Sequence, residues 1–497
     1  MSSADKIPGS STLSVEGLMI WLRQPVDASS VILFRVAFGV VLAGWAWNYL
    51  STGRVTRLYI EPKFHFPYGG FEWVQPLPGS WMYAPFVLLL VLALLIAAGL
   101  FYRVATILFA VGITYVFLLE RTNYQNHYYL VCLVAWTLTL LPLNRLVAGD
   151  VWRGVVKEQA FVSRWVLVIL QFHIAIPYFY GGVAKITPDW LLGQPMGIYL
   201  ESKANWPFIG PWLASSWAGV LFSYGGLLFD LAIVPLLIWK RTRMLAFLAA
   251  VAFHLSNAVL FSIHIFPWFM ILATTLFFSP DWVRRLLASG RRKEEDATPF
   301  HSNTPNQPKG ESMLIYGFVC YAVFHLFWPL RCQLYQEETS WTERAHLFSW
   351  RMMLRAKEVG LGFAIRDPET GAVKNINHAE YLDPEQAEKF GRDPHNILSF
   401  ARFIARINRS PSGKTPEVYA FVAASLNGRK PQLMIDPNVN LAGLTKEEIR
   451  EGKWIMPLVE PLRFPAWNLP PSQWREHMDL PEIKFLKPTV SNTNQAS

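Results

Sequence analysis

Residues 82–100 have the sequence MYAPFVLLLVLALLIAAGL, in which no side chain is charged. The length of this run is close to the roughly 20 residues that an α-helix needs to cross the hydrocarbon core of a membrane. A helix that is apolar on all its sides is buried either in a large protein core or in lipid. The stretch therefore predicts a transmembrane helix.

Eight similar apolar runs occur elsewhere in the 497-residue chain. Because 52% of all residues are hydrophobic and only 16% are charged, the composition excludes an ordinary soluble enzyme. The sequence predicts a polytopic α-helical membrane protein with about nine spans, with the short pair near 245–278 either spanning or re-entrant. The further runs are Val31–Leu50, Val104–Leu119, Tyr128–Leu143, Trp165–Tyr180, Ala218–Trp239, Leu245–Phe261, Phe266–Phe278 and Met313–Leu330.

Positive charges are concentrated in alternate loops, as is typical of cytoplasmic loops. We therefore place the N-terminus inside and the C-terminal part outside. The net charge of +9 follows from this topology and from attraction to a membrane surface. No basic stripe with interleaved aromatic residues occurs, so we expect no nucleic-acid partner. The basic residues of the predicted interior loops are Arg145, Arg153, Lys157, Arg164, Lys240, Arg241, Arg243, Arg284, Arg285, Arg291, Arg292 and Lys293.

Changes in composition divide the chain into six parts. The N-terminal residues are polar and lack the apolar core of a secretory signal, and a charged, Pro- and Ser-rich stretch before the last span is typical of a solvated linker. Prolines and polar residues favour poor order at the C-terminal end. The predicted parts are a polar segment (1–24), a transmembrane helical domain (25–288), a cytoplasmic linker (289–310), the last transmembrane helix (311–334), an extracytoplasmic domain (335–470) and a flexible tail (471–497).

The predicted outer domain has the pattern of a smaller α+β, β-rich module. Strand-like runs flank the turns Asp367–Gly371 and Asn427-Gly428, which predicts two hairpins. Helical patterns occur at about His395–Asn408 and Thr445–Glu451, and the second begins with a capping box that ends at Glu448. The strand-like runs are Val359–Ile365 with Ala372–Ile376, and Val418–Leu426 with Gln432–Ile435.

Several kinds of chemistry lack their motifs in this sequence. Cys132, Cys320 and Cys332 have no CxxC or Cys/His metal-ligand spacing, so we predict neither a metal site nor a disulfide framework. Gly-rich phosphate loops, GxSxG elbows and HExxH are also absent, which gives nucleotide and hydrolase chemistry little support.

Ionisable residues at membrane depth are costly and are therefore functional candidates. Lys185 ends the stretch Tyr178-Phe-Tyr-Gly-Gly-Val-Ala-Lys185, at the outer end of a predicted span. A lysine in an apolar pocket loses its preference for the charged form, so it can act as a neutral-amine base. The alternative is an interfacial lysine that snorkels toward water beside Trp190. We expect Arg35 and Asp230 to pair with other buried groups.

Two further polar pairs lie in or beside apolar runs. Asn126 and His127, at the outer mouth of a hairpin, suit hydrogen bonding to a quinol or a peptide carboxylate, and equally suit helix capping. His254 and Asn257 are one helical turn apart and share a face. Taken alone, that pair favours an interhelical hydrogen bond.

These motifs occur in an order similar to that of the vitamin K-dependent gamma-glutamyl carboxylase family, with its HTTM-type transmembrane domain, over roughly residues 25–460. The order of the motifs is more specific than any one of them. The matching motifs are Phe34-Arg35, Phe38-Gly39, Pro76-Leu77-Pro78, Trp81-Met82-Tyr83, Gly99-Leu100, Tyr102-Arg103, Tyr115–Leu119, Asn126-His127, Gly182-Val183 with Lys185, Asp189-Trp190, Gly225-Gly226, Asp230-Leu231, Phe253-His254, Asn257, Leu260-Phe261-Ser262-Ile263, Ser279-Pro280, Trp341-Thr342, Ser349-Trp350 and Met352-Met353.

The resemblance implies a lyase, a peptidyl-glutamate 4-carboxylase. In that family a lysine deprotonates reduced vitamin K, which reacts with O2 to form a strong base. This base removes a proton from the γ-carbon of a protein-bound glutamate, the carbanion captures CO2, and the quinone leaves as its epoxide. By position, Lys185 matches the catalytic base, and Asn126 and His127 match the polar pair beside it.

The resemblance also implies the partners. The co-substrates would be reduced vitamin K or menaquinol, O2 and CO2, without a metal. The substrate would be a glutamate-containing peptide or protein that approaches from outside, while the quinone enters from the membrane lipids. The residues expected to bind these substrates are Tyr178, His254, Asn257, Ser349 and Trp350.

The chain departs from the animal carboxylases in the outer motif, where His346, Phe348 and Arg355 stand in place of tyrosines and a nearby histidine. The stretch Tyr59–Val74 also lacks the cysteine that bridges to the outer domain in those enzymes. We therefore expect a bacterial-type member in the inner membrane, with its C-terminal domain extracytoplasmic. Two alternatives stay open: a quinol oxygenase (epoxidase) that does not carboxylate, and a non-catalytic membrane protein that binds a quinone or lipid.

Overall fold

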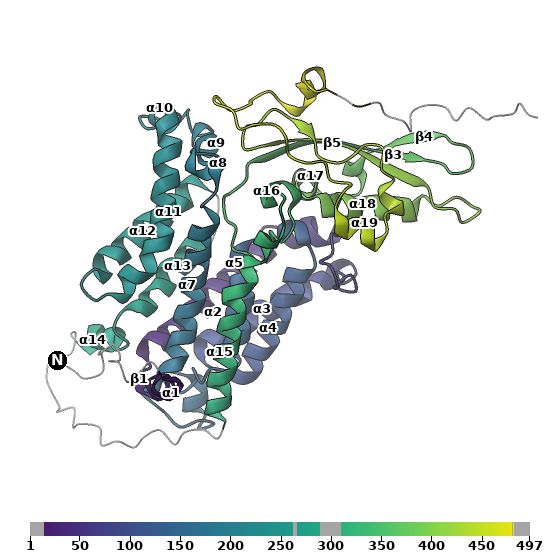
Figure 1. Ribbon diagram of the computed structural model, residues 1–497. Coiled ribbons are helices and arrows are strands. Elements are labelled where there is room, and N and C mark those ends of the chain that lie inside the picture. Colours follow the sequence, from purple (N-terminus) through teal and green to yellow (C-terminus); the bar gives the residue numbers. More distant parts are fainter. Residues whose placement is uncertain (1–13, 262–265, 289–309, 480, 482–497) are drawn as a thin grey trace, which may run out of the picture.

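The computed structural model describes residues 14–261, 266–288, 310–479 and 481 (Figure 1). A bundle of long helices carries at one end a smaller domain with a β-sheet, and helix α15 (Glu311–Phe327) leads from the bundle into that domain. Ser262 and Ile263 of the matching motifs lie outside the described residues. So do most of the predicted N-terminal segment, the linker up to residue 309, and nearly all of the predicted tail beyond residue 479.

Seven helices are long and apolar enough to cross a membrane, which confirms a polytopic helical membrane protein. The other two apolar runs form shorter helices, α5 (Asn126–Leu138) and α13 (Phe266–Thr274), of 13 and 9 residues. Pro142 and Pro280 follow these two helices closely, and the residue before a proline is biased away from helix. The seven are α2 (Ser29–Ser51), α3 (Tyr83–Ala98) with η4 (Gly79–Met82), α4 (Tyr102–Leu118), α7 (Arg164–Ala184), α11 (Ser216–Ile238), α12 (Arg243–Leu260), and α15 with η7 (Trp328–Leu334).

The two apolar runs of the short pair near 245–278 therefore differ in the structure. Helix α12 reaches the length of a span, whereas α13 stays short even with the 3-10 turn η6 (Thr275–Phe277) that continues it. About nine apolar runs thus correspond to seven helices of spanning length.

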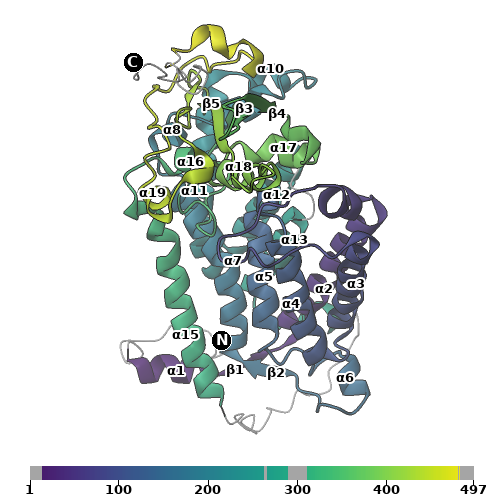
Figure 2. The same cartoon turned by 90° about the vertical axis from the view of Figure 1, so that its right-hand side faces the viewer.

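The end of the bundle opposite to the β-sheet gathers segments that are far apart in sequence. Strand β1 (Pro25–Asp27) pairs antiparallel with β2 (Phe161–Ser163). Arg284 Nε, in α14 (Trp282–Ala288), lies 2.8 Å from Asp27 Oδ2. These segments border loops that we assigned to the interior, so the path of the chain agrees with the predicted alternation of loops. Helices α1 (Val15–Arg23) and α6 (Gly149–Trp152) also lie at this end (Figure 2).

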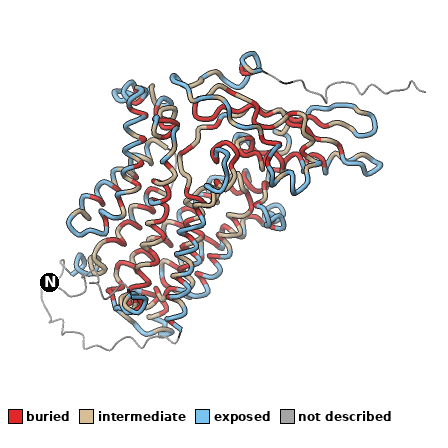
Figure 3. Tube along the Cα trace, in the orientation of Figure 1, coloured by how far each residue is buried: buried red, intermediate tan, exposed pale blue. Residues whose placement is uncertain are grey.

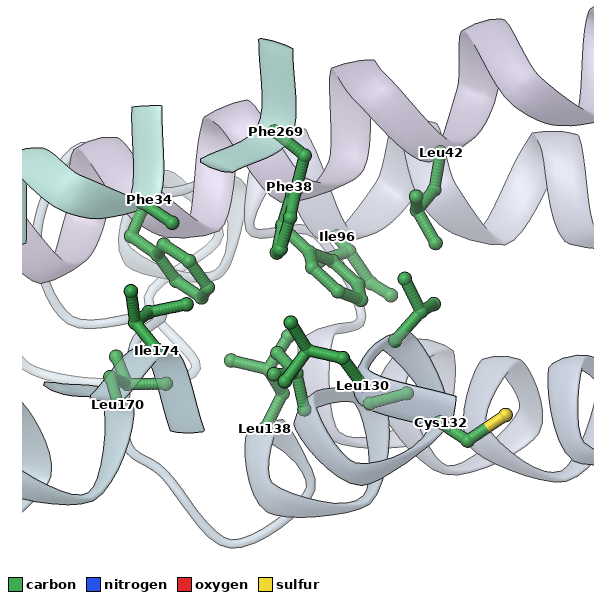
Figure 4. Packing of buried hydrophobic residues seen from close by; sticks show 14 of the residues in the cluster. Phe34, Phe38, Leu42, Ile96, Leu130, Cys132, Leu138, Leu170, Ile174 and Phe269 are labelled. Atoms are coloured by element: carbon green, nitrogen blue, oxygen red, sulfur yellow. The ribbon is translucent and has the colours of Figure 1, made fainter. Parts of the chain in front are cut away.

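Aromatic side chains pack the centre of the bundle (Figure 4). Phe34 and Phe38 of α2 contact Phe269 of α13, with ring centroids 6.1 and 6.3 Å apart. Helices α2 and α3 approach closely at Gly39, where a Cβ atom would lie 2.5 Å from the carbonyl oxygen of Ala93. The outward faces of the helices remain exposed (Figure 3), as lipid-facing surfaces do.

Arg35 is buried in this bundle, and its side chain forms hydrogen bonds to main-chain carbonyl oxygens. Its guanidinium donates to the carbonyl oxygens of Leu143 (2.7 Å), Val147 (2.8 Å) and Ala97 (3.1 Å). The expectation that Arg35 pairs with buried groups is confirmed, and its guanidinium joins α2 to the last turn of α3 and to the loop between α5 and α6.

The C-terminal domain, which we call the outer domain after its predicted side of the membrane, is built on a four-stranded antiparallel sheet in the order β4-β3-β5-β6. Both predicted hairpins are confirmed, and β3 also pairs with β5 along its whole length, from Lys357↔Leu426 to Arg366↔Glu417. The capping box of Thr445 and Glu448 is confirmed as well. The elements are β3 (Lys357–Arg366), β4 (Val373–Ile376), β5 (Glu417–Leu426), β6 (Gln432–Leu433), α16 (Thr339–Thr342), α17 (Pro384–Phe390), α18 (Pro394–Ile407), α19 (Lys446–Glu451), η8 (His378–Glu380), η9 (Leu441–Gly443) and η10 (Pro471–His477).

The two domains pack together through the loop after α2. Phe66 of this loop is fully buried in the outer-domain core, with its ring centroid 5.5 Å from that of Phe390. The Glu120 carboxylate accepts hydrogen bonds from the Phe66 amide (3.2 Å) and from Gln386 Nε2 (2.6 Å). The bundle and the sheet domain thus form one packed unit. Short elements in the connecting loops are η3 (Thr56–Ile60), η5 (Arg121–Asn123), α8 (Pro188–Leu191), α9 (Met196–Glu201) and α10 (Gly210–Leu213).

The first part of the predicted tail is packed. Residues 471–477 form η10, and Trp474 is buried beside Gly360 of β3, where a Cβ atom would lie 3.8 Å from the tryptophan ring. A single buried tryptophan thus anchors a stretch whose proline-rich composition favours poor order.

Candidate active site

A cavity of about 600 Å³ lies between the outer ends of α7, α11 and α12 and the first segment of the outer domain. Aromatic and aliphatic side chains of the membrane helices form most of its walls, and polar side chains gather at its outer end. Two of the eight predicted site residues, Ser349 and Trp350, do not line it. The six that do are Lys185, Asn126, His127, Tyr178, His254 and Asn257.

Lys185 follows the last turn of α7 and points at α11. Its Nζ lies 2.6 Å from Asp230 Oδ2 and donates to the Gly181 carbonyl oxygen at 3.1 Å. Lys185 and Asp230 are 6% and 5% exposed, so water contributes little to the solvation of either charge. Pairing offsets part of the cost of burying both charges. Asp230 thus has the buried partner that we expected for it.

Small residues make this contact possible. At Gly182 a Cβ atom would lie 2.6 Å from the Leu231 side chain and 3.2 Å from its amide nitrogen, which is too close for any larger residue. At Gly181 a Cβ atom would lie 3.1 Å from Asp230 Oδ2. The paired glycines therefore bring α7 against α11 and place the lysine beside its carboxylate.

Trp190 covers the lysine from the other side. The Lys185 ammonium lies 5.2 Å from the centroid of the Trp190 ring, within the range of a cation–π contact. The indole Nε1 donates to the Ser223 carbonyl oxygen at 2.7 Å, which fixes the ring on α11. Because the ammonium is held by a carboxylate, a carbonyl oxygen and a ring, it does not snorkel into solvent.

Asp189, next to Trp190, ties this segment to the outer domain. Arg429 binds its carboxylate with two hydrogen bonds of 2.6 and 2.7 Å, and Asn427 Nδ2 donates to it at 2.8 Å. Both partners lie in the turn between β5 and β6. The turn that we predicted at Asn427-Gly428 thus holds the end of a membrane helix.

Two further predicted residues are hydrogen-bonded to each other across the cavity wall. Tyr178 Oη and His254 Nε2 lie 2.6 Å apart, joining α7 to α12. This is the interhelical hydrogen bond that the sequence favours for His254, although its partner is Tyr178. Asn257 is one turn further along α12 and lines the same cavity.

Asn126 and His127 begin α5 on the opposite wall. Asn126 Oδ1 accepts a hydrogen bond from Tyr124 Oη (2.9 Å), and Asn126 Nδ2 donates to the Arg351 carbonyl oxygen (3.3 Å). The His127 ring stacks on Phe266, with centroids 5.0 Å apart. Asn126 thus connects the membrane domain to the outer-domain segment that closes the cavity.

That segment, residues 343–355, has an unusual main chain. Non-glycine residues rarely adopt positive φ angles, and clusters of them occur at functional sites. The positive φ angles here are 59° at Glu343, 53° at Ala345, 61° at Phe348, 55° at Trp350 and 60° at Met353. Ser349 braces the segment, because its hydroxyl accepts from Arg331 at 2.9 Å and donates to Ala345 at 2.7 Å. Trp350 is buried beneath it against Tyr129, with ring centroids 5.0 Å apart.

The same segment supplies a cationic wall. Arg351 and Arg355 line the cavity together with His346. The buried carboxylate of Glu343 forms an ion pair with Arg355, lies 2.8 Å from Lys357 Nζ and lies 3.7 Å from His346 Nδ1. Burial lowers the pKa of Arg355 to about 10 and that of His346 to about 3, so at pH 7 the arginine is charged and the histidine is neutral.

Residues 23–282 match the HTTM domain family. Residues 310–461 match the lumenal domain of vitamin K-dependent gamma-carboxylase. The chain belongs to the vitamin K-dependent gamma-glutamyl carboxylase family. No solved structure matches it. In this family member the two matched regions meet at the cavity, because Lys185 and Asp230 come from the first and Arg351 and Arg355 from the second.

Three of these site residues were not assigned to the site from the sequence. For Asp230 the sequence held a usable signal. It lies four residues after Gly226 and therefore on the same helix face, which is the face that lines the cavity. Arg351 and Arg355 are likewise four apart, but no regular helix or strand contains them. Within the described residues, no group of three or more His, Cys, Asp and Glu side chains is placed to hold a metal ion.

Proposed function

We propose that this protein is a quinol-dependent peptidyl-glutamate γ-carboxylase. The observation that carries the proposal is the buried Lys185–Asp230 pair, 2.6 Å apart, in a cavity that joins apolar membrane helices to a cationic outer wall. The reaction would convert quinol, O2, CO2 and a glutamyl residue into quinone epoxide, γ-carboxyglutamyl and water.

Lys185 is proposed to take the proton of the quinol hydroxyl as a neutral amine, so that its ion pair with Asp230 is the state that follows the transfer. An amine that accepts a proton beside the Asp230 carboxylate becomes one half of an ion pair, which is strongly favoured where water is excluded. The Gly181 carbonyl oxygen, 3.1 Å away, accepts a second ammonium hydrogen. The Asp230 carboxylate and the Gly181 carbonyl oxygen therefore keep the amine aimed at the cavity.

The cavity fits a flat, mostly apolar co-substrate. Its walls include Phe222, Phe253, Phe261 and Phe266, and its volume of about 600 Å³ suits a ligand of cofactor size. A reduced quinone bound there would supply, through its reaction with O2, the strong base that removes the γ-proton. We propose reduced vitamin K or menaquinol, entering from the lipid, with Asn126, His127 and the Tyr178–His254 pair positioning its polar groups.

The cationic wall fits the glutamate. Arg351 and Arg355 line the end of the cavity formed by the outer domain, where a carboxylate can be held by charge-assisted hydrogen bonds. Holding the carboxylate there would point the γ-carbon toward the centre of the cavity. We propose that the outer domain is extracytoplasmic, in a bacterial inner membrane, so that the peptide arrives from that side.

Carboxylation by the purified protein tests this proposal. The protein in nanodiscs is given reduced vitamin K, O2, labelled bicarbonate and a short glutamate peptide, and label incorporation and quinone epoxide are both measured. Lys185→Ala should lose both products by at least about a hundredfold, in the usual range for removal of a general base. Lys203→Ala, a lysine of the same outer loop that lies over the Trp206 ring and does not line the cavity, should keep both.

One observation favours a second candidate. Arg355 is already engaged by Glu343, so the protein could use the cavity for quinol oxidation without binding a substrate glutamate. Epoxide that depends on Lys185 but forms without label incorporation would establish that quinol oxygenase. Absence of both products from the wild-type protein would leave the non-catalytic quinone-binding alternative.

A further inference from the structure

A second, separate cleft of about 800 Å³ lies beside the reaction cavity, between α18 and the loop after α2. Its ionisable side chains are basic, with Glu72 as the acidic exception among the described lining residues. The basic side chains that line it are Lys63, His65, Arg121, His395, Arg402, Arg406 and Arg409.

Helix α18 supplies a basic stripe along this cleft. His395, Arg402 and Arg406 are spaced by seven and four residues, so they share one helix face, and Arg409 follows just after the helix end. The opposite face is buried in the outer-domain core through Ile397, Phe400 and Ile404. The three arginines of the stripe are exposed, whereas His395 is half-buried, and the fold of α18 does not depend on the arginines.

His395 is half-buried and burial lowers its pKa, so the charges of this stripe are those of the arginines, and they are largely uncompensated. Arg406 and Arg409 are exposed, and neither forms an ion pair within the described part of the chain. Arg402 donates to the Leu444 carbonyl oxygen, which positions it without neutralising it. Between the cations the floor is apolar, because Phe64 and Phe403 stack with ring centroids 4.6 Å apart. A ligand for this cleft should carry several negative charges and some apolar surface.

The cleft and the reaction cavity are lined by neighbouring residues of one loop. Arg121 lines the cleft, and Tyr124, whose amide donates to the Arg121 carbonyl oxygen at 3.0 Å, lines the cavity. Arg121 also pairs with Asp393 at 2.5 Å, and Asp393 is the N-cap of α18. From His395 to Arg406 the stripe runs about 16 Å at 1.5 Å per residue, which about five residues of an extended peptide would span.

We infer that this cleft binds an acidic segment of the substrate protein, next to the glutamate that enters the reaction cavity. The inference rests on the proposed function, since it assigns the cleft to the same peptide. Several carboxylates along an extended chain match the spaced arginines, and the apolar floor accommodates an intervening side chain. A lipid headgroup would match the charges, but not the length of the stripe or its position beside the cavity.

Peptide binding, measured without quinol, tests the inference apart from catalysis. Two fluorescent peptides are compared on the full protein in nanodiscs of uncharged lipid: a short glutamate peptide, and the same peptide with six acidic and apolar residues added at either end. The extended peptide should bind about tenfold more tightly at low salt, and this gain should shrink as salt is raised. Arg406→Gln/Arg409→Gln should reduce the gain at least about fivefold while leaving the short peptide unaffected.

The matched control is Lys374→Gln/Lys453→Gln, which removes two exposed charges of the outer domain that do not line the cleft, and it should keep the gain. Equal binding of the two peptides to wild-type protein would overturn the inference. The inference would also be overturned if the extended peptide gave no gain while the protein bound anionic lipid through these arginines. That result would assign the stripe to the membrane. If the gain is present but no carboxylation occurs, the proposed function fails and the acidic-segment site stands.

Discussion

At the scale of single residues, the Lys185–Asp230 pair connects stability with chemistry. Removing one partner of a buried ion pair leaves an uncompensated charge, which typically costs about 3–5 kcal/mol of unfolding free energy. Asp230→Asn should therefore lower the stability of the detergent-solubilised protein by about that amount. Thermal unfolding followed by tryptophan fluorescence measures it.

The double variant Lys185→Met/Asp230→Asn separates the two roles of the pair. Because it removes both charges, it should recover much of the lost stability while staying inactive in the epoxidation assay. A double variant as unstable as Asp230→Asn alone would mean that the pair contributes packing and not charge compensation.

His346 predicts a pH dependence of stability. Burial lowers its pKa to about 3, followed in size by the repulsion of Arg351 and Lys357, whereas the unfolded chain has the ordinary value near 6.5. Between these pH values the unfolded state binds more protons, so the free energy of unfolding falls as pH drops, by up to ~1.4 kcal/mol per pH unit. His346→Gln should lose less stability than wild type between pH 7 and pH 5. His477→Gln, an exposed histidine, should follow wild type.

At this scale the sequence could identify candidate site residues, but it could not show which of them contact each other. Lys185 stood out because a lysine at the end of an apolar run is costly, and His254 and Asn126 stood out as polar residues in or beside apolar runs, whereas Tyr178 was predicted only from the family resemblance. That Lys185 faces Asp230, 45 positions later, depends on how α7 and α11 cross. The positive φ angles of residues 343–353 leave no trace in a sequence without glycine at those positions.

At the scale of elements, the contact between α7 and α11 is set by Gly182. An alanine there would place its Cβ 2.6 Å from Leu231, so α11 must shift, at a cost of about 1–3 kcal/mol. The same shift would lengthen the Lys185–Asp230 distance, and Gly182→Ala should therefore lose both stability and epoxidation. Gly317→Ala is the control, since Gly317 also lies within a helix but has nothing within 4 Å of its added Cβ, and it should be as stable as wild type or slightly more so.

Local elements of the outer domain could be predicted, whereas their assembly could not. The Asp367–Gly371 and Asn427-Gly428 turns and the Thr445 capping box are signals within a few residues, and each is confirmed. The pairing of β3 with β5 joins strands about 60 residues apart, for which the sequence holds no short-range signal. Helix α13 stays below the length of a span, which is one of the two outcomes that the sequence left open for the short pair near 245–278.

At the scale of the whole molecule, the cavity exists only because the two domains are held together. Two of the attachments are Phe66 with Glu120 and Gln386, and Asp189 with Arg429. The second lies one residue from Trp190, so it connects the β5–β6 turn directly to the ring that covers Lys185. Domain attachment and active-site geometry are thus coupled at α8.

Arg429→Lys tests this coupling, because a lysine cannot form the two parallel hydrogen bonds that Arg429 gives to Asp189. Loss of a bidentate pair that is largely buried should cost about 1–2 kcal/mol, which corresponds to a roughly five- to thirtyfold slower epoxidation if Trp190 and Lys185 move with α8. Arg392→Lys makes the same exchange at a single, more exposed contact, to Glu388 at 2.8 Å, and should leave the rate unchanged. Asp189→Asn should match Arg429→Lys, and combining the two should add little, since both remove the same contact. Additive losses, or an unchanged rate in Arg429→Lys, would show that the outer domain closes the cavity without controlling the position of the lysine.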